Sequence, residues 1–429
     1  MVAKFSIEST KELLTARCGL AIFGEYLDSI DFSTDVNRLL PRPKSNNGIA
    51  ASHYVSSLVT MLHAGGKYLE DIRLLQGDEG LKKLMDFHIP SADAIGDWLR
   101  RMGNQTHAMS GLTRVNNNLA DRYFSALAPD DRNNDIGLTL DIDASGIESG
   151  KYSAKYTYKG FKGYMPIIGH VGQFIVGEEF REGNIAPADG NLEFIKHCLL
   201  QMPEGHSIKA VRADSASYQA SIINFCKKNN LKYAIGGKIT EGLAGEIQAL
   251  SEQDWQVYTD KHGVKSDRQI TSMPWSMEKT PDSFTLVIIR SKIENPDLFT
   301  GGYKYHVVAT NITNKTAAEI MQWYSQRGED SENRIKELKA GFAMEYMPCG
   351  SFEANAAFFR IGSISYNLAL LLKIELLGKR FARATIATIR LYVYQIPAKV
   401  IRTARKLVIK TTAAAAELFQ NMRLKIKPT

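Results

Sequence analysis

The sequence is poor in cysteine. Its 429 residues include only four cysteines, at positions 18, 198, 226 and 349, and none belongs to a Cys-x-x-Cys pair. Zinc modules and disulfide frameworks need more closely spaced cysteines, so the sequence argues against both kinds of stabilisation. Scattered single cysteines are typical of proteins in a reducing compartment.

Long hydrophobic runs and a secretion signal are missing as well. The first residues, MVAKFSIESTKELL, contain no apolar stretch followed by a small-residue cleavage site. The apolar run at residues 361–372 has about half the length that crosses a bilayer. Glycine and proline, at 33 and 13 residues, are too few for a low-complexity chain. We therefore expect a soluble, cytoplasmic protein of roughly two to four domains, without a membrane partner.

Positive charge is in excess and is concentrated at one end. The formal net charge is +7, but residues 376–429 contain twelve basic residues and one acidic residue. The rest of the chain is therefore slightly acidic. The basic residues alternate with Ile, Leu, Val and Tyr, which predicts a folded, helical, basic segment suited to a phosphate backbone. A solvated helix face is the plainer alternative.

The order of predicted elements indicates an α/β fold flanked by helices. Residues 1–130 are predicted to be helical, and the helix at 92–102 ends in two arginines, which suits a helix-turn-helix reader or a plain bundle equally. From residue 136 to about 236, short strands alternate with helices. Another strand at 305–310 precedes long helices at 315–341 and 353–378. Such alternation is typical of an α/β sheet.

Two of the predicted strands end in an aspartate. The first closes with Leu140-Asp-Ile-Asp143 and the second with Val211-Arg-Ala-Asp214. In open α/β sheets, sites form at the carboxyl ends of strands. A single aspartate there more often caps a turn, but two at equivalent places favour a site. A third carboxylate from a later helix would complete a hard-oxygen site for Mg²⁺.

The candidate for that third carboxylate lies in the segment from Tyr324 to Lys339, YSQRGEDSENRIKELK. Glu332 and Lys339 are seven residues apart, which is two helical turns, so we expect them on one face. A carboxylate beside a lysine and an arginine suits a site that binds a metal and a phosphate together. A surface helix with ion pairs along it explains the same composition.

Taken together, these motifs resemble those of bacterial DDE transposases of insertion-sequence family thirteen-eighty, within the wider group that carries a Y-R-E-K helix. The resemblance runs essentially from end to end. Its motifs are CGLAIFGEYL, LPRPKSNNG, HAGGKYLEDIR, IPSADAIGDWLRRMG, LDIDAS, REGN, VRADS, YAIGGK, ENRIKELK and IPAKVIRTARKLV. Each motif alone is weak, but their order and spacing are specific.

The resemblance implies a ribonuclease-H-like core with a mixed sheet, interrupted by an insertion domain between the second aspartate and the glutamate. We therefore expect five parts: a helical N-terminal DNA-binding domain at 1–130, the first part of the catalytic core at 131–238, the insertion domain at 239–304, the second part of the core at 305–375 and a basic helical segment at 376–429.

Catalytic residues and metal ligands are also implied by the resemblance. Asp143 matches the first aspartate, in the pattern Asp-x-Ser, with Asp141 as the alternative. Asp214 matches the second aspartate, and Glu332 matches the glutamate. These three carboxylates would hold two Mg²⁺ ions, or Mn²⁺ in their place. One ion would activate water or a 3′-hydroxyl, and the other would stabilise the leaving oxygen.

The helix departs from the family pattern in its spacing. Four residues separate Arg327 from Glu332 where the family has three, and Ser331 stands where strict counting places the carboxylate. Either a turn or bulge near Gly328 absorbs the extra residue, or the phosphate contacts differ. Two weaker alternatives to Glu332 are Glu329 and Asp330.

The activity implied by the resemblance is cut-and-paste DNA transposition. One site would cut DNA at the terminal inverted repeats of a mobile element and join the ends to target DNA. Three residues of the helix would hold the phosphates of the scissile strand: Tyr324, Arg327 and Lys339. Because two ends must be paired, we expect a homodimer in the synaptic complex, acting at the nucleoid in the bacterial cytoplasm.

Further DNA contacts are predicted outside this helix. The segment 151–164 holds four lysines and no acidic residue among aromatics and glycines, which suits a DNA-tracking loop. The candidate contacts are Lys155, Lys159 and Lys162 in this segment and Arg402, Arg405 and Lys406 in the C-terminal one. Related transposases flip a base against an aromatic residue of the insertion; the candidates are Trp275 and Trp255, although a core tryptophan is the simpler interpretation.

Two alternatives to an active transposase remain. The altered spacing before Glu332 leaves open a catalytically inactive, transposase-derived DNA-binding protein. Another ribonuclease-H-like nuclease, such as a structure-specific resolvase, is disfavoured by the basic C-terminal segment and the N-terminal helices.

Overall fold

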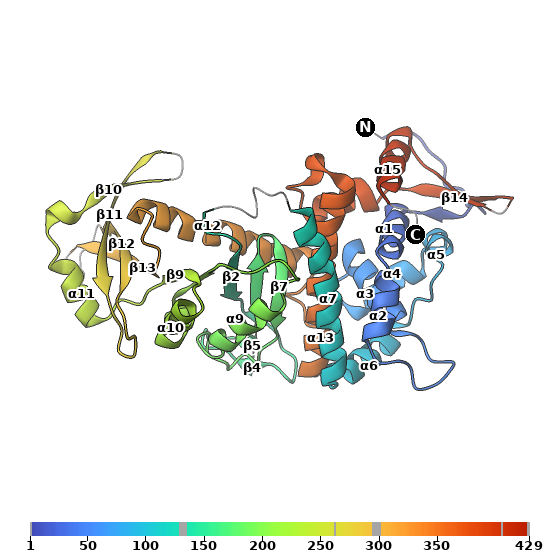
Figure 1. Ribbon diagram of the computed structural model, residues 1–429. Coiled ribbons are helices and arrows are strands. Elements are labelled where there is room, and N and C mark those ends of the chain that lie inside the picture. The colour runs from blue at the N-terminus through green and yellow to red at the C-terminus, as the bar shows by residue number, and fades with distance from the viewer. Residues whose placement is uncertain (1, 128–134, 261–262, 294–301, 405, 427–429) are drawn as a thin grey trace. The chain divides into compact units, whose positions relative to one another are not determined.

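The computed structural model describes residues 2–426 apart from 128–134, 261–262, 294–301 and 405, and the side chains of residues 329–332 also lie outside the description. The chain, traced in Figure 1, forms two compact units. Unit 1 comprises residues 1–119, 151–153 and 337–429, and unit 2 comprises residues 120–150 and 154–336.

Unit 2 is built on a nine-stranded mixed sheet with the strand order β10-β11-β12-β13-β9-β8-β2-β6-β7. In chain order the strands are β2 (Thr139–Ala144), β6 (Ile167–Val171), β7 (Phe174–Glu179), β8 (Ala210–Ala213), β9 (Lys232–Gly236), β10 (Gln256–Thr259), β11 (Lys265–Trp275), β12 (Phe284–Lys292) and β13 (Tyr303–Thr310). The central strands are buried along most of their length, as expected for a sheet that is covered on both faces.

Five of these strands position the candidate residues. β2, β6 and β7 are antiparallel neighbours, whereas β8 and β9 run parallel to β2. Helices α9 (Asn191–Leu200) and α10 (Ala220–Lys228) lie on one face of the sheet, and α12 (Ala317–Lys336) crosses the other (Figure 1). This arrangement is consistent with the ribonuclease-H-like core expected from the sequence.

The segment expected as an insertion domain extends the same sheet. Helix α11 (Glu241–Gln248) and strands β10, β11 and β12 follow β9, and β13 then pairs with β9 in an antiparallel ladder. The sequence of this segment shows no clear alternation of apolar and polar residues. The reason is that most of β11 is exposed or half-buried, with only Ile270 and Thr271 buried.

A small three-stranded sheet follows β2 directly. Its strands β3 (Ile147–Glu148), β4 (Lys155–Tyr156) and β5 (Lys162–Tyr164) pair in the order β3-β5-β4. The N–H of Ser145 donates to the carbonyl of Pro166 at 3.0 Å. The segment 145–166, which contains this small sheet, therefore begins and ends at one point beside the end of β2. The lysine-rich segment predicted as a loop is therefore partly an ordered sheet.

Unit 1 is mainly helical. Its central helix, α13 (Phe352–Leu372), is buried almost throughout and packs against α3 (Ala51–Ala64) and α6 (Ala92–Gly103). The continuous helical stretch Phe352–Leu377 is long and apolar enough to cross a membrane, but 83% of its apolar window is buried inside the protein. The other α-helices of unit 1 are α1 (Gly19–Ser29), α2 (Phe32–Leu39), α4 (Arg73–Gln76), α5 (Glu79–Met85), the first part of α7 (Thr106–Ala126), α14 (Ile386–Ile389) and α15 (Ala413–Lys425).

Helix α6, which ends in two arginines, belongs to this packing. Its Trp98 is buried and stacks on Tyr54 with ring centroids 5.0 Å apart. On its exposed side, Arg100 pairs with Asp97, so that face carries charges of both signs. These contacts favour the plain bundle over a helix that reads DNA.

The prediction of a helical C-terminal segment is wrong for residues 398–410. They form an antiparallel hairpin of β14 (Ala398–Thr403) and β15 (Lys406–Lys410), which β1 (Leu14–Thr15) extends to three strands. The physical reason is the high content of β-branched residues, which pack better on a pleated surface than in a helix. These residues are Val400, Ile401, Thr403, Val408 and Ile409.

His63, near the end of α3, is a polar centre in the core of unit 1. Its ring is fully buried and stacks on Phe23 with ring centroids 4.0 Å apart. Nε2 lies 3.0 Å from the carbonyl oxygen of Ser365 and therefore donates, so Nδ1 accepts from the Tyr394 hydroxyl at 2.8 Å. The imidazole is thus neutral, and burial lowers the pKa of His63 to about 3.

The protein should therefore lose stability as the pH falls below 6.5, the ordinary pKa of histidine. Between that pH and about 3 only the unfolded state takes up the proton, so the contribution of His63 is complete above pH 6.5 and is lost below it, by up to about 5 kcal/mol. The check is the urea midpoint of the wild type and of His63→Gln from about pH 7 to about pH 4, where the wild type should fall more steeply. Buried His170 titrates in both proteins, so parallel curves would contradict the role of His63.

Candidate active site

Strand pairing places Asp143 and Asp214 side by side. β2 and β8 are parallel with Ile142 opposite Ala213, so Asp143, the next residue of β2, and Asp214, the residue after β8, lie at the same edge. Asp143 is partly exposed. Asp214 caps the following turn, since its Oδ1 accepts from the N–H of Ala216 at 3.0 Å. The structure therefore brings these two candidate residues together.

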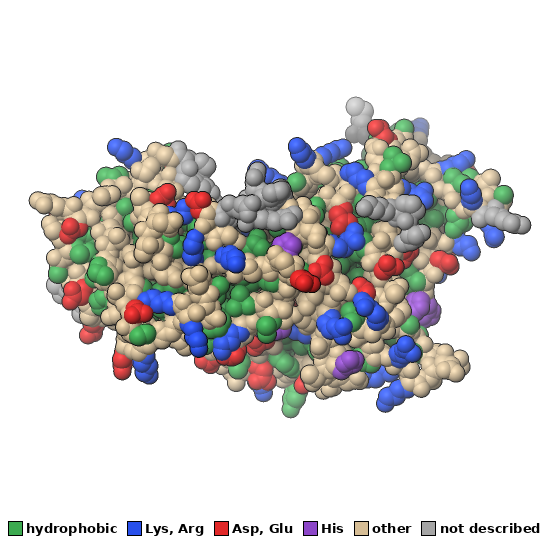
Figure 2. All heavy atoms as spheres, in the orientation of Figure 1, with side chains coloured by type: hydrophobic (Ala, Val, Ile, Leu, Met, Phe, Trp, Pro, Cys, Tyr) green, Lys and Arg blue, Asp and Glu red, His purple; other side chains and the backbone are tan. Residues whose placement is uncertain are grey.

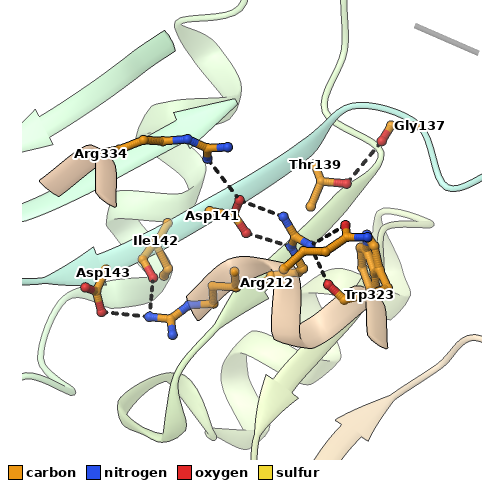
Figure 3. Close-up of polar contacts among 10 residues, drawn as sticks. Gly137, Thr139, Asp141, Ile142, Asp143, Arg212, Trp323 and Arg334 are labelled. Atoms are coloured by element: carbon orange, nitrogen blue, oxygen red, sulfur yellow. Dashed lines mark hydrogen bonds and ion pairs between the residues drawn. The ribbon is translucent and has the colours of Figure 1, made fainter. Parts of the chain in front are cut away.

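Arg327 of α12 is the third residue at this edge. Its Nη2 donates to Oδ1 of Asp143 at 2.7 Å and to the carbonyl oxygen of Ile142 at 3.2 Å (Figure 3). Its Nε–H is buried and has no acceptor among the described residues. Helix α12 therefore holds a guanidinium against the end of β2, with one buried donor that has no acceptor among the described residues.

Tyr324, nearly one turn before Arg327, reaches the end of β9. A Cβ atom on Gly236 would lie only 2.7 Å from the Tyr324 hydroxyl, so a glycine at this position leaves room for the phenol. Burial raises the pKa of Tyr324; the Arg327 guanidinium opposes this rise, and the carboxylates of Asp214 and Asp143 add to it. The phenol is thus protonated at neutral pH and can donate a hydrogen bond at the same edge.

A buried ion pair lies behind this edge. Asp141, two residues before Asp143 on the same face of β2, accepts from Arg212 at 2.7 and 2.8 Å, and both side chains are buried. Arg212 also donates to the carbonyl oxygen of Trp323 and lies 5.2 Å from the centroid of its ring. Arg334 stands 3.6 Å from Asp141 (Figure 3). Both halves of α12 are thereby tied to β2, and Asp141 has a structural role.

Arg212 and Arg334 were not predicted from the sequence. One signal could have found the first of them: Asp141 and Arg212 each stand two residues before the aspartate that ends their strand. In the parallel register they are therefore opposite each other. Arg334 leaves no such signal, because its contact depends on how α12 crosses the sheet.

The helix α12 runs without interruption through Gly328, so no turn or bulge absorbs the extra residue between Arg327 and Glu332. A continuous helix therefore agrees with the second explanation of the altered spacing, in which the phosphate contacts differ. The backbone of Glu332 belongs to α12, and the side chains of Glu329, Asp330 and Glu332 lie outside the described residues.

Lys339 lies beyond α12, in the π-helical turn Glu337–Gly341 that belongs to unit 1. The α-helix ends at Lys336, so the seven residues from Glu332 to Lys339 are not two regular α-helical turns, and a shared face for the two side chains stays a prediction. A π-helical turn has more residues than an α-helical turn and shifts the phase of the residues after it.

Comparison with protein families decides what kind of protein carries these residues. The family described as Transposase DDE domain group 1 matches residues 4–428, nearly the whole chain. The chain belongs to the DDE transposases. No curated protein matches the sequence.

Divalent metal ions are typical of DDE transposases. Asp143 and Asp214 offer carboxylate oxygens at one edge of the sheet, the donor type that Mg²⁺ prefers. Among the side chains that the structure describes, no group of three or more His, Cys, Asp and Glu residues is arranged to hold a metal ion, and Glu332 is not among those side chains. The two aspartates fit a divalent ion as two of its ligands.

Three of the lysines predicted to contact DNA belong to the small sheet that follows Asp143. Lys155 is on β4, Lys162 begins β5, and Lys159 lies in the turn between them with Nζ 5.6 Å from the Tyr158 ring centroid. The neighbouring rings of Tyr156 and Tyr158 are 72% and 63% exposed, so this sheet presents aromatic rings together with cations.

The two tryptophans differ in their surroundings. Trp255 is buried, and the guanidinium of Arg290 covers its ring at 4.1 Å from the centroid. Arg290 also donates to Glu252 at 3.0 Å, which fixes it there. Trp255 is thus a packing residue, the simpler interpretation of the two. Trp275 is half-buried at the end of β11, opposite Phe284.

The basic candidates near the C-terminus belong to unit 1. Arg402 is on β14 and Lys406 on β15, and both side chains are exposed. Arg405 lies outside the described residues.

Proposed function

We propose that this DDE transposase belongs to insertion-sequence family thirteen-eighty, and that it cuts DNA at the inverted repeats of its element and joins the ends to target DNA. The observation that carries the proposal is the pairing of Asp143 and Asp214 at adjacent strand ends, against Arg327 and Tyr324 of α12. Carboxylates next to a cation and a phenol suit chemistry on a phosphodiester, whose charge must be stabilised on several sides.

Asp143, Asp214 and Glu332 would hold two divalent ions. When bound, such ions activate the attacking water or 3′-hydroxyl and stabilise the leaving oxygen. The sequence shows no serine, histidine and aspartate spacing of the kind that forms a covalent protein intermediate. Strand joining would use the same site with the freed 3′-hydroxyl.

The chain itself would orient the DNA strand. Arg327 has a buried Nε–H without an acceptor among the described residues, and a phosphate oxygen would accept from it. Tyr324 would donate its hydroxyl proton to the same strand. A Cβ atom on Gly328 would meet nothing within 4 Å, so α12 leaves open space one residue after Arg327. A glycine inside a helix costs about 1 kcal/mol relative to alanine, which points to a use for that space.

Glu332 remains the proposed third carboxylate on the strength of the family pattern, with Glu329 and Asp330 as the weaker alternatives.

Other surfaces would hold DNA beyond the active site. Lys155, Lys159 and Lys162 would contact the backbone near the cleaved end, and Trp275 remains the candidate for stacking a flipped base. Two copies would pair the two element ends in the bacterial cytoplasm, at the nucleoid.

The test is cleavage of a duplex that carries the element's terminal inverted repeat, with full-length protein and Mg²⁺ or Mn²⁺. We expect cuts at the element end, and we expect Glu332→Gln to slow them by about a thousandfold, the scale for losing one charge-stabilising group. Glu329→Gln, three residues away, is the matched control and should keep most of the activity.

Two results would count against these assignments. Full activity of Glu332→Gln would show that the third ligand is a different residue. Binding of the inverted repeat without cleavage in either metal would favour the catalytically inactive DNA-binding protein.

A further inference from the structure

We propose that the hairpin β14–β15 is a DNA-docking ribbon that enters the major groove of double-stranded DNA. The proposal rests on the proposed action on DNA, but it concerns a surface of unit 1, whereas the strand-end aspartates belong to unit 2. Four observations on the hairpin carry it: its charge, its free cations, its anchored base and its dimensions.

The charge on the hairpin is of one sign. Residues 398–410, AKVIRTARKLVIK, contain five basic residues and no acidic one. The ladder places Lys399 opposite Lys410, and Lys406 opposite Thr403 at the tip. Like charges that face each other across a ladder destabilise a hairpin, by up to about 1 kcal/mol for each pair. A polyanion along the hairpin would remove that repulsion.

Three of these five cations have no partner among the residues that the structure describes. Lys399 pairs with Glu12, but the side chains of Arg402, Lys406 and Lys410 form no hydrogen bond or ion pair among the described residues. Other basic residues of the C-terminal segment already have partners within the protein. Arg390 donates to the carbonyl oxygens of Leu62 and Gly341, and Arg423 pairs with Glu25.

The base of the hairpin is anchored and its tip projects. Ala398 and Val400 are buried, and the N–H of Val400 donates to the carbonyl oxygen of Leu13 at 2.8 Å. Towards the tip, Leu407 and Val408 are 40% and 38% exposed. Figure 1 shows the two strands extending away from the helices of their unit, and Figure 2 shows Lys and Arg side chains along them. The hairpin thus presents side chains on a fixed frame.

The dimensions suit the major groove. Paired strands lie about 4.8 Å apart and rise about 3.3 Å per residue, so the six residues of β14 extend for about 20 Å. The major groove is about 12 Å wide and admits a two-stranded ribbon. Arg402 and the lysines would reach phosphates and guanine edges, while Leu407 and Val408 would contact thymine methyl groups. Lysines that only protect an exposed strand edge from aggregation are the rival explanation.

The first experiment measures duplex binding by the full-length protein without divalent metal, by fluorescence anisotropy on a duplex of about 30 base pairs. The variant is Arg402→Gln with Lys406→Gln and Lys410→Gln. The control removes three positive charges from exposed positions of unit 2 that have no proposed DNA contact, through Lys209→Gln, Lys228→Gln and Lys279→Gln. Since the hairpin variant loses like-charge repulsion, it should fold at least as well as the wild type.

We expect the hairpin variant to bind at least about tenfold more weakly and its salt slope to fall by two to three, at about 0.9 per lost phosphate contact. The control should bind like the wild type. Equal losses in the two variants, or no loss in either, would overturn the proposal and favour edge protection.

The second experiment tests the groove. All four native cysteines are buried, so Thr403→Cys provides a single exposed thiol at the tip for an iron chelate. Hydroxyl radicals from the tip should cut a few neighbouring nucleotides, with the 5′ offset between strands that a major-groove source gives. Cutting no stronger than from Lys228→Cys, an exposed position without a proposed DNA contact, would overturn the proposal. If the protein binds DNA through the hairpin but does not cut it, the proposed function is contradicted and the DNA-docking ribbon is still supported.

Discussion

Asp143→Asn should reduce strand cleavage by about a thousandfold or more while leaving duplex binding unchanged. The substitution removes the negative charge that a divalent ion needs, but it keeps a side-chain oxygen that can accept from Arg327, as Oδ1 does now at 2.7 Å. The fold should therefore persist. Asp214→Asn should have the same effect, because it occupies the equivalent position on the neighbouring strand.

The measurement compares cleavage rate in Mg²⁺ with duplex affinity in the absence of metal. Asp282→Asn is a matched control, since Asp282 is a highly exposed aspartate of unit 2 whose nearest cation, Lys227, lies 3.7 Å away. It should cut like the wild type. If Asp143→Asn keeps cutting at the wild-type rate, the strand-end aspartates are not the catalytic residues, whatever their geometry.

The position of these two aspartates was predictable from sequence for a physical reason. A short apolar strand that ends in Asp-x-Ser or Ala-Asp-Ser fixes where the chain leaves the sheet, and parallel pairing then brings the two ends to one edge. The third carboxylate was harder to place. Its position depends on the phase of α12 against the sheet, which the sequence does not mark. The change to a π-helical turn at Glu337–Gly341 also leaves no clear mark, and it affects Lys339 rather than Glu332.

The C-terminal hairpin shows how a strand can be taken for a helix. Lys399, Arg402, Lys406 and Lys410 are spaced by three, four and four residues, which is the period of one helix face. The turn at the tip contains Ala404, with φ of 52°, instead of the glycine or asparagine that usually marks a two-residue hairpin. Only the β-branched residues of this segment indicate strands.

Buried arginines are a feature that composition and net charge do not reveal. Arg212 is buried and Arg390 half-buried, and carbonyl oxygens or a carboxylate hold them there, although arginine is usually a surface residue. The net charge of the C-terminal segment therefore overstates the charge that its surface offers to DNA.

Arg212→Met should destabilise the protein by about 3–5 kcal/mol, the usual cost of breaking a buried ion pair. The substitution would leave the Asp141 carboxylate, 3% exposed, without the two hydrogen bonds that it now accepts. Arg334, at 3.6 Å, compensates only part of that loss. Arg212→Met would also remove the hydrogen bond to the carbonyl oxygen of Trp323, which holds the first half of α12 against the sheet.

A double-mutant cycle with Asp141→Leu separates a buried charge from a simple loss of packing. Each single substitution leaves one charge buried alone, whereas the double variant removes both, so it should be more stable than Arg212→Met alone. Urea unfolding of the four proteins gives the coupling free energy. If the two single losses add in the double variant, the pair contributes packing only. Cleavage should stay low in the double variant even when stability returns, because α12 would no longer be tied to β2 through Arg212 and Asp141.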